Sequence, residues 1–325
     1  MTDPQEQQTR ALALPDQELR EVVAALKQKG RAPSTVRGYA GDLGRFEAWA
    51  RAHDRSARPA SSETVQLYLA ALRVSGLRAS TIGRALAAIV AGHRLDHQEV
   101  PVDEETRVQM SGIRRDLGTA PRQARALSTA EIRQMVMACP SNLHGLRDRA
   151  LILVGFGGGF RRSELVALNV EDVTEDATPG QEGLHIVIGR SKTDQEAKGR
   201  EVGIRRGRHP HTDAMAALAE WRAAGNVETG ALFRSVDKGS HVGSRLSDRA
   251  VALIVKIAAA RAGLDPAMVS GHSLRAGLAT SASRAGATPE QIMRQTGHRS
   301  LEMVARYVRA GDLLGSANVG NLLDL

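Results

Sequence analysis

The sequence predicts a two-domain protein that is mainly α-helical with a small β-sheet, an α+β fold. Apolar residues recur at helical spacing in both halves of the 325-residue chain. Two runs of strand character, GLHIVIG and REVGI, predict a hairpin in the second half. Between the halves, RRDLGTAPRQARAL combines Gly, Pro and charged residues and lacks apolar periodicity. With 42% apolar residues, the chain is long enough to bury a core in each half.

The first half is predicted to be an all-α domain of four or five helices. Serines precede or begin three runs with apolar residues at helical spacing, and we expect them to act as helix caps: Ser34, either Ser61 or Ser62, and Ser80. We place this domain at residues 15–117, after a flexible tail of residues 1–14. The segment without periodicity is interpreted as a linker, residues 118–127.

The second half, residues 128–325, is predicted to be a larger and mostly helical domain. Ser128 and Glu131 form the S-x-x-E pattern of a capping box at its start. Near its end, Thr288 and Pro289 predict the first residues of the helix TPEQIMRQT. The predicted hairpin lies between these two points and supplies the small sheet.

Composition excludes several classes of protein. No run of about 18 uncharged apolar residues is present, which argues against a membrane-spanning helix. The N-terminal residues MTDPQEQQTR contain no hydrophobic segment for secretion. The single cysteine, Cys139, cannot form an internal disulfide, so we expect a cytoplasmic protein. The formal charge of +8 favours a polyanionic partner.

Five residues in four motifs predict a site for a phosphodiester: Arg161 in GFRRSEL, Lys192 in GRSKTD, His272 and Arg275 in GHSLR, and Tyr307 in HRSLEMVARYV. Two arginines can place guanidinium forks on the oxygens of one phosphate and stabilise its transition state without a metal. A phenol is a poor nucleophile near pH 7 unless a base takes its proton. His272 could be that base, and Lys192 could protonate the leaving oxygen.

Other interpretations of these motifs stay open from the residues alone. Arg161 and Arg162 are adjacent, and either could be the catalytic arginine or part of a basic surface pair. Lys198 competes with Lys192 because both lie between the two predicted strands. The glycine-rich run GFGGGF at 155–160 lacks the ending of a nucleotide-binding P-loop and is better explained by backbone freedom before Arg161. Histidines 209 and 211 lack the further ligands of a metal site.

The motifs GFRRSELVALNVEDV, IGRSKTD, SGHSLRAGLAT and QTGHRSLEMVARYV resemble the signature boxes of the tyrosine recombinase (phage integrase) family. The resemblance covers residues from about 128 to 315, and spacing in the last two boxes is most similar to the Cre-type members. It implies a set of catalytic positions: Arg161, Glu164 as its acidic supporter, Lys192, His272, Arg275, His298 and Tyr307. Cre resembles this chain but has Trp where His298 stands, whereas His is the commoner choice in the family.

The resemblance also implies a fold and a reaction. The fold would be a two-domain, C-shaped clamp on double-stranded DNA, with an N-terminal helical bundle and a C-terminal catalytic domain. The reaction would be site-specific recombination through a 3′-phosphotyrosine, with conservative strand exchange through a Holliday junction and with neither cofactor nor metal. The partners would be DNA with inverted half-sites and further copies of the chain, a dimer on each site and a tetramer in synapsis, with an accessory directionality protein as a further possibility.

Basic residues in two stretches are expected to contact DNA phosphates, which gives salt-sensitive affinity. They are Arg114, Arg115, Arg122, Arg125, Arg162, Arg190, Lys198 and Arg200. The last residues, 312–325, carry a short apolar stripe and are too few for a stable isolated helix. We expect a docking helix there, packed either on its own catalytic domain or, as the Cre-type resemblance implies, on a neighbouring protomer.

Two other functions use similar residues. A type IB topoisomerase or a telomere resolvase would relax DNA or make hairpins without strand exchange. A DNA-binding protein without activity could keep the same scaffold, but all the predicted catalytic positions are occupied here by suitable residues.

Overall fold

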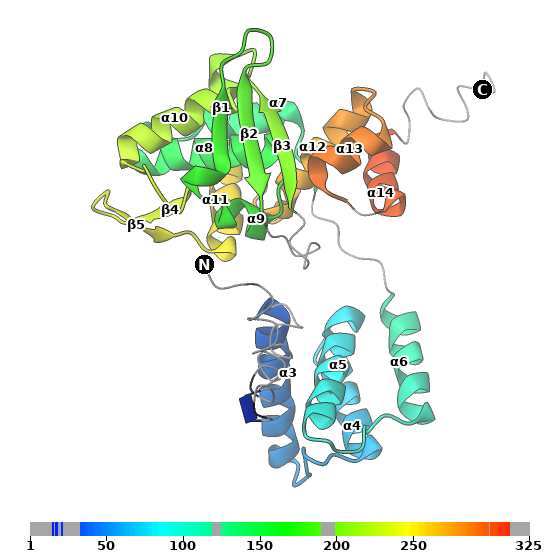
Figure 1. Cartoon of the computed structure of the whole chain (residues 1–325). Coiled ribbons are helices and arrows are strands. Elements are labelled where there is room, and N and C mark those ends of the chain that lie inside the picture. The colour runs from blue at the N-terminus through cyan, green and yellow to red at the C-terminus, as the bar shows by residue number, and fades with distance from the viewer. Residues whose placement is uncertain are drawn as a thin grey trace, which may run out of the picture. The chain divides into compact units, whose positions relative to one another are not determined.

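The computed structural model describes residues 33–118, 125–189, 199–298 and 300–312, together with residues 15, 17, 18 and 21. For residues 33, 34, 306 and 308–312 the description covers the backbone only. The chain forms two compact units that divide between Arg122 and Gln123 (Figure 1). Both units are mostly helical, and the described strands lie in the second, so the structure is mainly α with small antiparallel sheets as the sequence predicts.

Four helices make up the described part of the first unit: α3 (Pro33–Ala52), α4 (Ser62–Val74), α5 (Ala79–Leu95) and α6 (Glu104–Leu117). Their apolar faces meet in one core around Phe46, Leu69 and Ile82. The ring of Phe46 lies 5.0 Å from that of Tyr68, centroid to centroid. Burial of such rings and aliphatic side chains is the main favourable term that holds the four helices together.

The predicted caps of this unit are partly right. Ser61, not Ser62, caps α4, and its hydroxyl accepts from the amide of Thr64 at 3.2 Å. The expectation for Ser80 is wrong, because α5 already begins at Ala79 and its cap is Arg78, which makes no side-chain capping bond. Ser34 is not a cap either, since it lies inside α3.

The second unit begins with helices and continues into two small sheets. Its elements are α7 (Thr129–Met137), α8 (Leu143–Gly157), α9 (Arg162–Ala167), η1 (Val170–Asp172), β1 (Val173–Asp176), β2 (Gly183–Ile188), β3 (Arg200–Arg205), η2 (Pro210–Thr212), α10 (Ala214–Gly225), β4 (Arg234–Val236), β5 (Val242–Arg245), α11 (Asp248–Arg261), α12 (His272–Arg284), α13 (Pro289–Thr296) and α14 (Leu301–Asp312).

The predicted hairpin is present as β2 and β3, which pair antiparallel, and β1 extends them to a three-stranded sheet. In the register, Leu184 faces Ile204 and Ile186 faces Val202, and all four side chains are buried. Alternate residues of a strand share one face, so these residues direct the sheet onto the core. In Figure 1 the sheet lies in front of α8 and α10.

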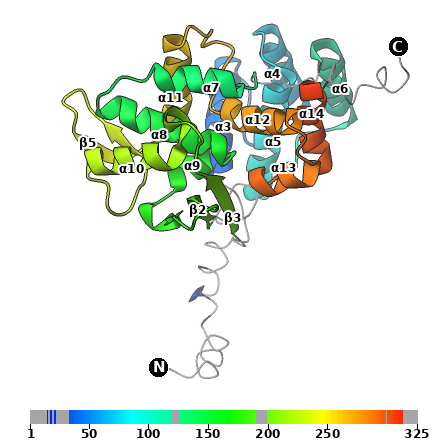
Figure 2. The ribbon, with the colours of Figure 1, turned by 90° about the horizontal axis from the view of Figure 1, so that it is seen from above.

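Helix α8 is the centre of the second core. An unbroken buried run, Ala150 to Val154, shows that protein surrounds this helix on all sides. Trp221 of α10 is fully buried beside it and donates its indole N–H to the carbonyl of Leu232 at 2.9 Å. Helices α12, α13 and α14 lie together at one end of this unit in both views (Figures 1 and 2).

The two predicted capping patterns of the second unit are confirmed. Ser128 and Glu131 make both bonds of the capping box at α7, and Thr288 caps α13 with Pro289 at its first residue. The chain just before α7 is attached to this unit, since the amide of Leu127 donates to the carbonyl of Ser273 and Leu127 is fully buried. No helix in the described part of the chain is long and apolar enough to cross a membrane.

Candidate active site

The turn between α8 and α9 brings Arg161 to the site. Gly159 has φ +58°, a backbone conformation that favours glycine. A Cβ on Gly159 would lie 2.9 Å from Cγ2 of Thr296, so the glycine also allows a close approach of α13. The glycine-rich run is therefore explained by backbone geometry. Arg161 follows it as the N-cap residue of α9, in an extended conformation.

Glu164 holds two arginines in place. It is 1% exposed, and its carboxylate accepts from Nη1 of Arg161 at 2.5 Å and from Nη2 of Arg200 at 3.2 Å. It also accepts from the backbone amide of Arg161 at 3.0 Å. A buried carboxylate needs such partners, and bonds between ionised groups are the stronger ones.

Arg275 is as deeply buried as Glu164, at 1% exposed. It lies in the first turns of α12, and its Nη1 donates to the carbonyl of Gly159 at 2.7 Å and also to the carbonyl of Thr296. Its Nη2 is buried and has no hydrogen-bond partner within the described chain. An unmade bond at a buried charged donor is costly, so this nitrogen is suited to an incoming anion.

The C-terminal end of α13 holds three arginines with three consecutive carbonyls. Gln295 O accepts from Nη1 of Arg200 at 2.7 Å, Thr296 O from Arg275, and Gly297 O from Nη2 of Arg161 at 3.4 Å. The last carbonyls of a helix lack intrahelical partners and carry its partial negative charge. Guanidinium groups supply both the donors and the opposite charge.

Tyr307 and His272 form the reactive pair of the site. Helix α14 presents Tyr307 to α12, and the Tyr307 hydroxyl lies 2.9 Å from Nε2 of His272. His272 is exposed overall, yet packing around its ring lowers its pKa, and the charges of Arg275 and Arg161 lower it further. Near pH 7 the imidazole is therefore neutral and able to accept a proton.

His298 also lies next to Tyr307. Their ring centroids are 5.4 Å apart, and His298 is 8% exposed. Burial and then the charges of Arg275 and Arg161 lower its pKa to about 3. Its Nδ1 lies 2.6 Å from the hydroxyl of Thr296.

The structure thus brings together six of the residues predicted for catalysis: Arg161, Glu164, His272, Arg275, His298 and Tyr307. Lys192, the seventh, lies outside the described residues, as do Arg122, Arg190 and Lys198 of the predicted DNA contacts. The predicted docking helix likewise lies outside them apart from the backbone of Asp312.

The other predicted DNA contacts occupy different settings. Arg114 and Arg115 are exposed on the last turn of α6 in the first unit. Arg162 is exposed next to Arg161, and Arg125 is exposed but paired with Glu131. Arg200 differs, because its side chain is 19% exposed and turned toward Glu164.

Sequence reasoning missed the inward direction of Arg200, although a signal was present. Arg200 begins β3, and residues at 200, 202 and 204 share one face of that strand. Val202 and Ile204 are buried, so the alternation places Arg200 on the buried face. The helical spacing of Leu301 and Val304 predicts that both are buried on α14, but Leu301 is 54% exposed. Val304, one turn later, carries the packing with Ile292 and Ala279.

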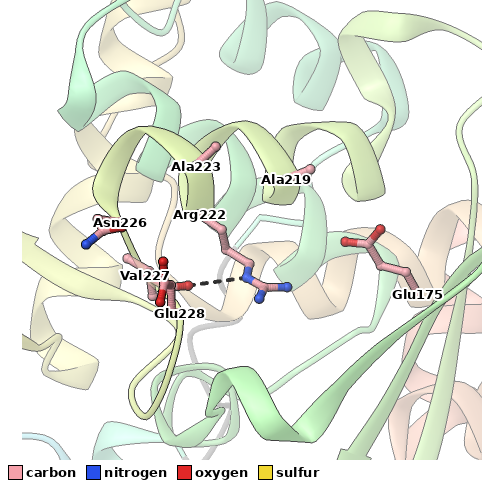
Figure 3. A pocket seen from close by; sticks show the side chains of 7 residues that line it. All are labelled: Glu175, Ala219, Arg222, Ala223, Asn226, Val227 and Glu228. Atoms are coloured by element: carbon pink, nitrogen blue, oxygen red, sulfur yellow. Dashed lines mark hydrogen bonds between the residues drawn. The ribbon is translucent and has the colours of Figure 1, made fainter.

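A separate hollow lies between α10 and β1, with a volume of about 430 Å³ (Figure 3). Arg222 and the carboxylates of Glu175 and Glu228 line it, and Nε of Arg222 donates to the carbonyl of Val227 at 3.3 Å. It contains none of the predicted catalytic residues.

Residues 125–312 match the phage integrase family, and residues 23–95 match the N-terminal SAM-like domain of phage integrases. The chain belongs to the phage integrase family. It is a tyrosine recombinase, an enzyme of site-specific DNA recombination.

Two relatives and one solved structure illustrate the likeness. The integrase/recombinase xerD homolog of Selenomonas ruminantium is 36% identical over 293 residues, 88% of this chain and 84% of that protein. Recombinase cre of Escherichia phage P1 is 28% identical over 299 residues, 86% of this chain and 84% of that protein. The XerH site-specific recombinase in a post-cleavage complex with a palindromic difH substrate has the same fold, with a TM-score of 0.64, 19% identity, and coverage of 89% of this chain and 79% of that one.

Proposed function

We propose that Tyr307 is the nucleophile of this recombinase and that it attacks a DNA phosphodiester among Arg161, Arg275, His272 and His298. The new bond joins the Tyr307 oxygen to phosphorus, and the bond from phosphorus to the 5′ oxygen breaks. The products are a 3′-phosphotyrosine and a free 5′ hydroxyl. The contact of 2.9 Å between the Tyr307 hydroxyl and His272 carries this proposal, because it supplies the nucleophile with a proton acceptor.

The arginines provide the binding energy for the phosphate. Arg161 and Arg200 pair with one carboxylate, that of Glu164, and the buried Arg275 is near enough to be influenced by its charge, so the cluster has more positive than negative charge. The open Nη2 of Arg275 offers one further donor. Donors already in position where charge develops are usually the largest catalytic term. Glu164 acts by holding Arg161 in place.

The recombinase retains the energy of the broken bond in the tyrosine ester, so a hydroxyl from a second duplex can rejoin the strand. We propose a substrate of double-stranded DNA with inverted half-sites, bound by a dimer, and a synaptic tetramer with residues 312–325 docked on a neighbouring protomer. The enzyme would act in the cytoplasm, where its one cysteine, buried and unpaired, stays reduced.

The nucleophile is tested by Tyr307→Phe, with Tyr39→Phe in the first unit as a matched control. The phenylalanine variant should bind DNA normally and form no covalent complex, because only the hydroxyl is removed. Complexes on a nicked suicide substrate are counted on a denaturing gel. A covalent band in the Tyr307 variant, or its loss in the Tyr39 variant with binding intact, would contradict the assignment.

Lys192 is proposed as the general acid for the leaving 5′ oxygen. Lys192→Ala should cleave ordinary DNA slowly and recover on DNA with sulfur at the leaving position, because a thiolate leaves without prior protonation. The rates on both substrates are compared in a single-turnover assay. Lys198→Ala is the control, and recovery in that variant alone would move the role to Lys198.

A further inference from the structure

Thr296, the last residue of α13, makes two hydrogen bonds with one hydroxyl. Its Oγ1 lies 2.6 Å from the carbonyl of Ile292 and 2.6 Å from Nδ1 of His298. A carbonyl oxygen only accepts, so the single hydroxyl proton is used toward Ile292. The hydroxyl oxygen must then accept from His298, and the proton of that bond must lie on Nδ1.

We propose that Thr296 is a positioning residue that holds the His298 ring with its proton on Nδ1, so that Nε2 of the neutral ring carries none. The proposal deepens the proposed function, since it gives the protonation state of a histidine assigned to the same site. The position of the proton on His298 applies to the free protein, and its effect on the reaction follows from it.

Thr296 is itself held in place from several directions. It is fully buried, and Arg275 donates to its carbonyl. Its methyl group faces Gly159 so closely that a Cβ there would lie 2.9 Å away. The bond to the carbonyl four residues earlier is a common use of a threonine hydroxyl in a helix. The hydroxyl therefore has little freedom to turn toward another partner.

The consequence concerns what His298 can donate. A neutral ring with its proton on Nδ1 offers only a lone pair at Nε2. To donate a hydrogen bond from Nε2 to a phosphate oxygen, the ring must first take up a proton. Thr296 accommodates that change, because Nδ1 remains a donor in the imidazolium form as well.

The surroundings make this proton uptake depend on the phosphate. Among the residues that the structure describes, the charged or titratable groups near His298 are Arg275 and His272 from α12, Arg161 before α9, Arg200 from β3 and Tyr307 from α14. Burial and the nearby guanidinium groups keep the ring neutral in the free protein. An anion between the arginines offsets their charge and raises the affinity of His298 for a proton. We therefore expect one proton to be taken up at His298 when the scissile phosphate binds.

Nitrogen NMR of the full chain tests the tautomer directly. The protein contains ten histidines, and the spectrum of the His298→Asn variant assigns the signals of His298. Long-range ¹H–¹⁵N correlation at neutral pH distinguishes a ring nitrogen that carries a proton from one that does not. We expect the proton on Nδ1 in the wild type and in Thr296→Ser. In Thr296→Val, which keeps the shape but loses the hydroxyl, we expect a mixture of tautomers. A proton on Nε2 in the wild type, or an unchanged spectrum in the valine variant, would overturn the proposal.

A pH profile of cleavage tests the role in the reaction. In the wild type, the contribution of His298 to cleavage should be lost as pH rises, because the neutral ring cannot donate from Nε2. Thr296→Val permits a neutral ring with its proton on Nε2, so its rate relative to the wild type should rise with pH, about tenfold over the range in which His298 loses its proton, and Thr296→Ser should follow the wild type. A uniform loss at every pH would indicate packing alone and overturn the positioning role. Failure of the Tyr307 assignment is separate, since the tautomer is measured without DNA.

Discussion

Each of the two units buries a carboxylate between two arginines, but the arginines differ in how far they are exposed. In the first unit, Asp42 is 2% exposed, and its partners Arg45 and Arg84 have side chains 62% and 51% exposed. In the second unit, Glu164 is 1% exposed, and its partners Arg161 and Arg200 are only 18% and 19% exposed. The first pair of arginines is mostly exposed, and the second pair is mostly buried.

The pKa directions show the difference between these clusters. Asp42 raises the pKa of Arg84, chiefly through their hydrogen bond, and Asp42 itself has a lowered pKa despite its burial. In the second unit, burial lowers the pKa of Arg200, and burial followed by the charge of Arg161 lowers that of Arg275 to about 10. The first cluster is complete by itself. The second keeps its arginines charged at neutral pH in a site that lacks enough negative charge, which is the state expected of an anion-binding site.

The largest expected effect is on the cleavage rate, and it should differ between the arginines of the two clusters. Arg275→Ala should lower the cleavage rate by about 10²-fold or more, the scale for a lost transition-state donor. Arg84→Ala should leave the rate of the chemical step unchanged, because its cluster only stabilises the first unit. Single-turnover cleavage at saturating DNA measures both. Equal losses in the two variants would remove the distinction between a structural and a catalytic arginine cluster.

Neutralising each carboxylate should have a smaller effect, on stability. Glu164→Gln leaves buried arginines without their counter-charge and should cost about 3 kcal/mol of unfolding free energy. Asp42→Asn should cost about 1 kcal/mol, because Arg45 and Arg84 can remain solvated. Urea unfolding, followed for each unit separately, measures the two costs. A larger cost for Asp42→Asn than for Glu164→Gln would contradict the comparison.

A further expected effect is on the pH dependence of stability. The pKa of His298 is lowered to about 3 in the folded protein, so between that pH and about 6.5 the unfolded chain binds the proton more readily. Its contribution therefore destabilises the second unit as pH falls through this window. His298→Asn should show a weaker loss of stability from pH 6.5 to 4.5, as measured by unfolding at each pH. The Asp42 carboxyl acts at lower pH, since its stabilising effect is lost only as pH falls below about 3.8.

Much of the site could be predicted from local patterns. The three-residue spacing of His272 and Arg275 places them on one face of a helix. The caps at Ser128 and Thr288 can be predicted from the neighbouring residues alone. Ser80 could not be excluded as a cap, because Ala79 joins the helix through its burial in the core, a tertiary effect. The support of the arginines by the end of α13 could not be predicted either. Backbone carbonyls have no sequence signature, and their use depends on three segments meeting in space.

Because the end of α13 holds its arginines through main-chain oxygens, the alignment of these arginines at residues 295–297 depends less on the side chains than on the length of the segment. Gly297 is the exception: its φ is +67°, and a Cβ there would lie 2.8 Å from Nε of Arg200. An inserted or deleted residue would exchange which oxygen meets which guanidinium, and Arg161, Arg200 and Arg275 would all lose their alignment together. The alignment of the three guanidinium groups therefore depends on the number of residues in this segment more than on the chemistry of their side chains.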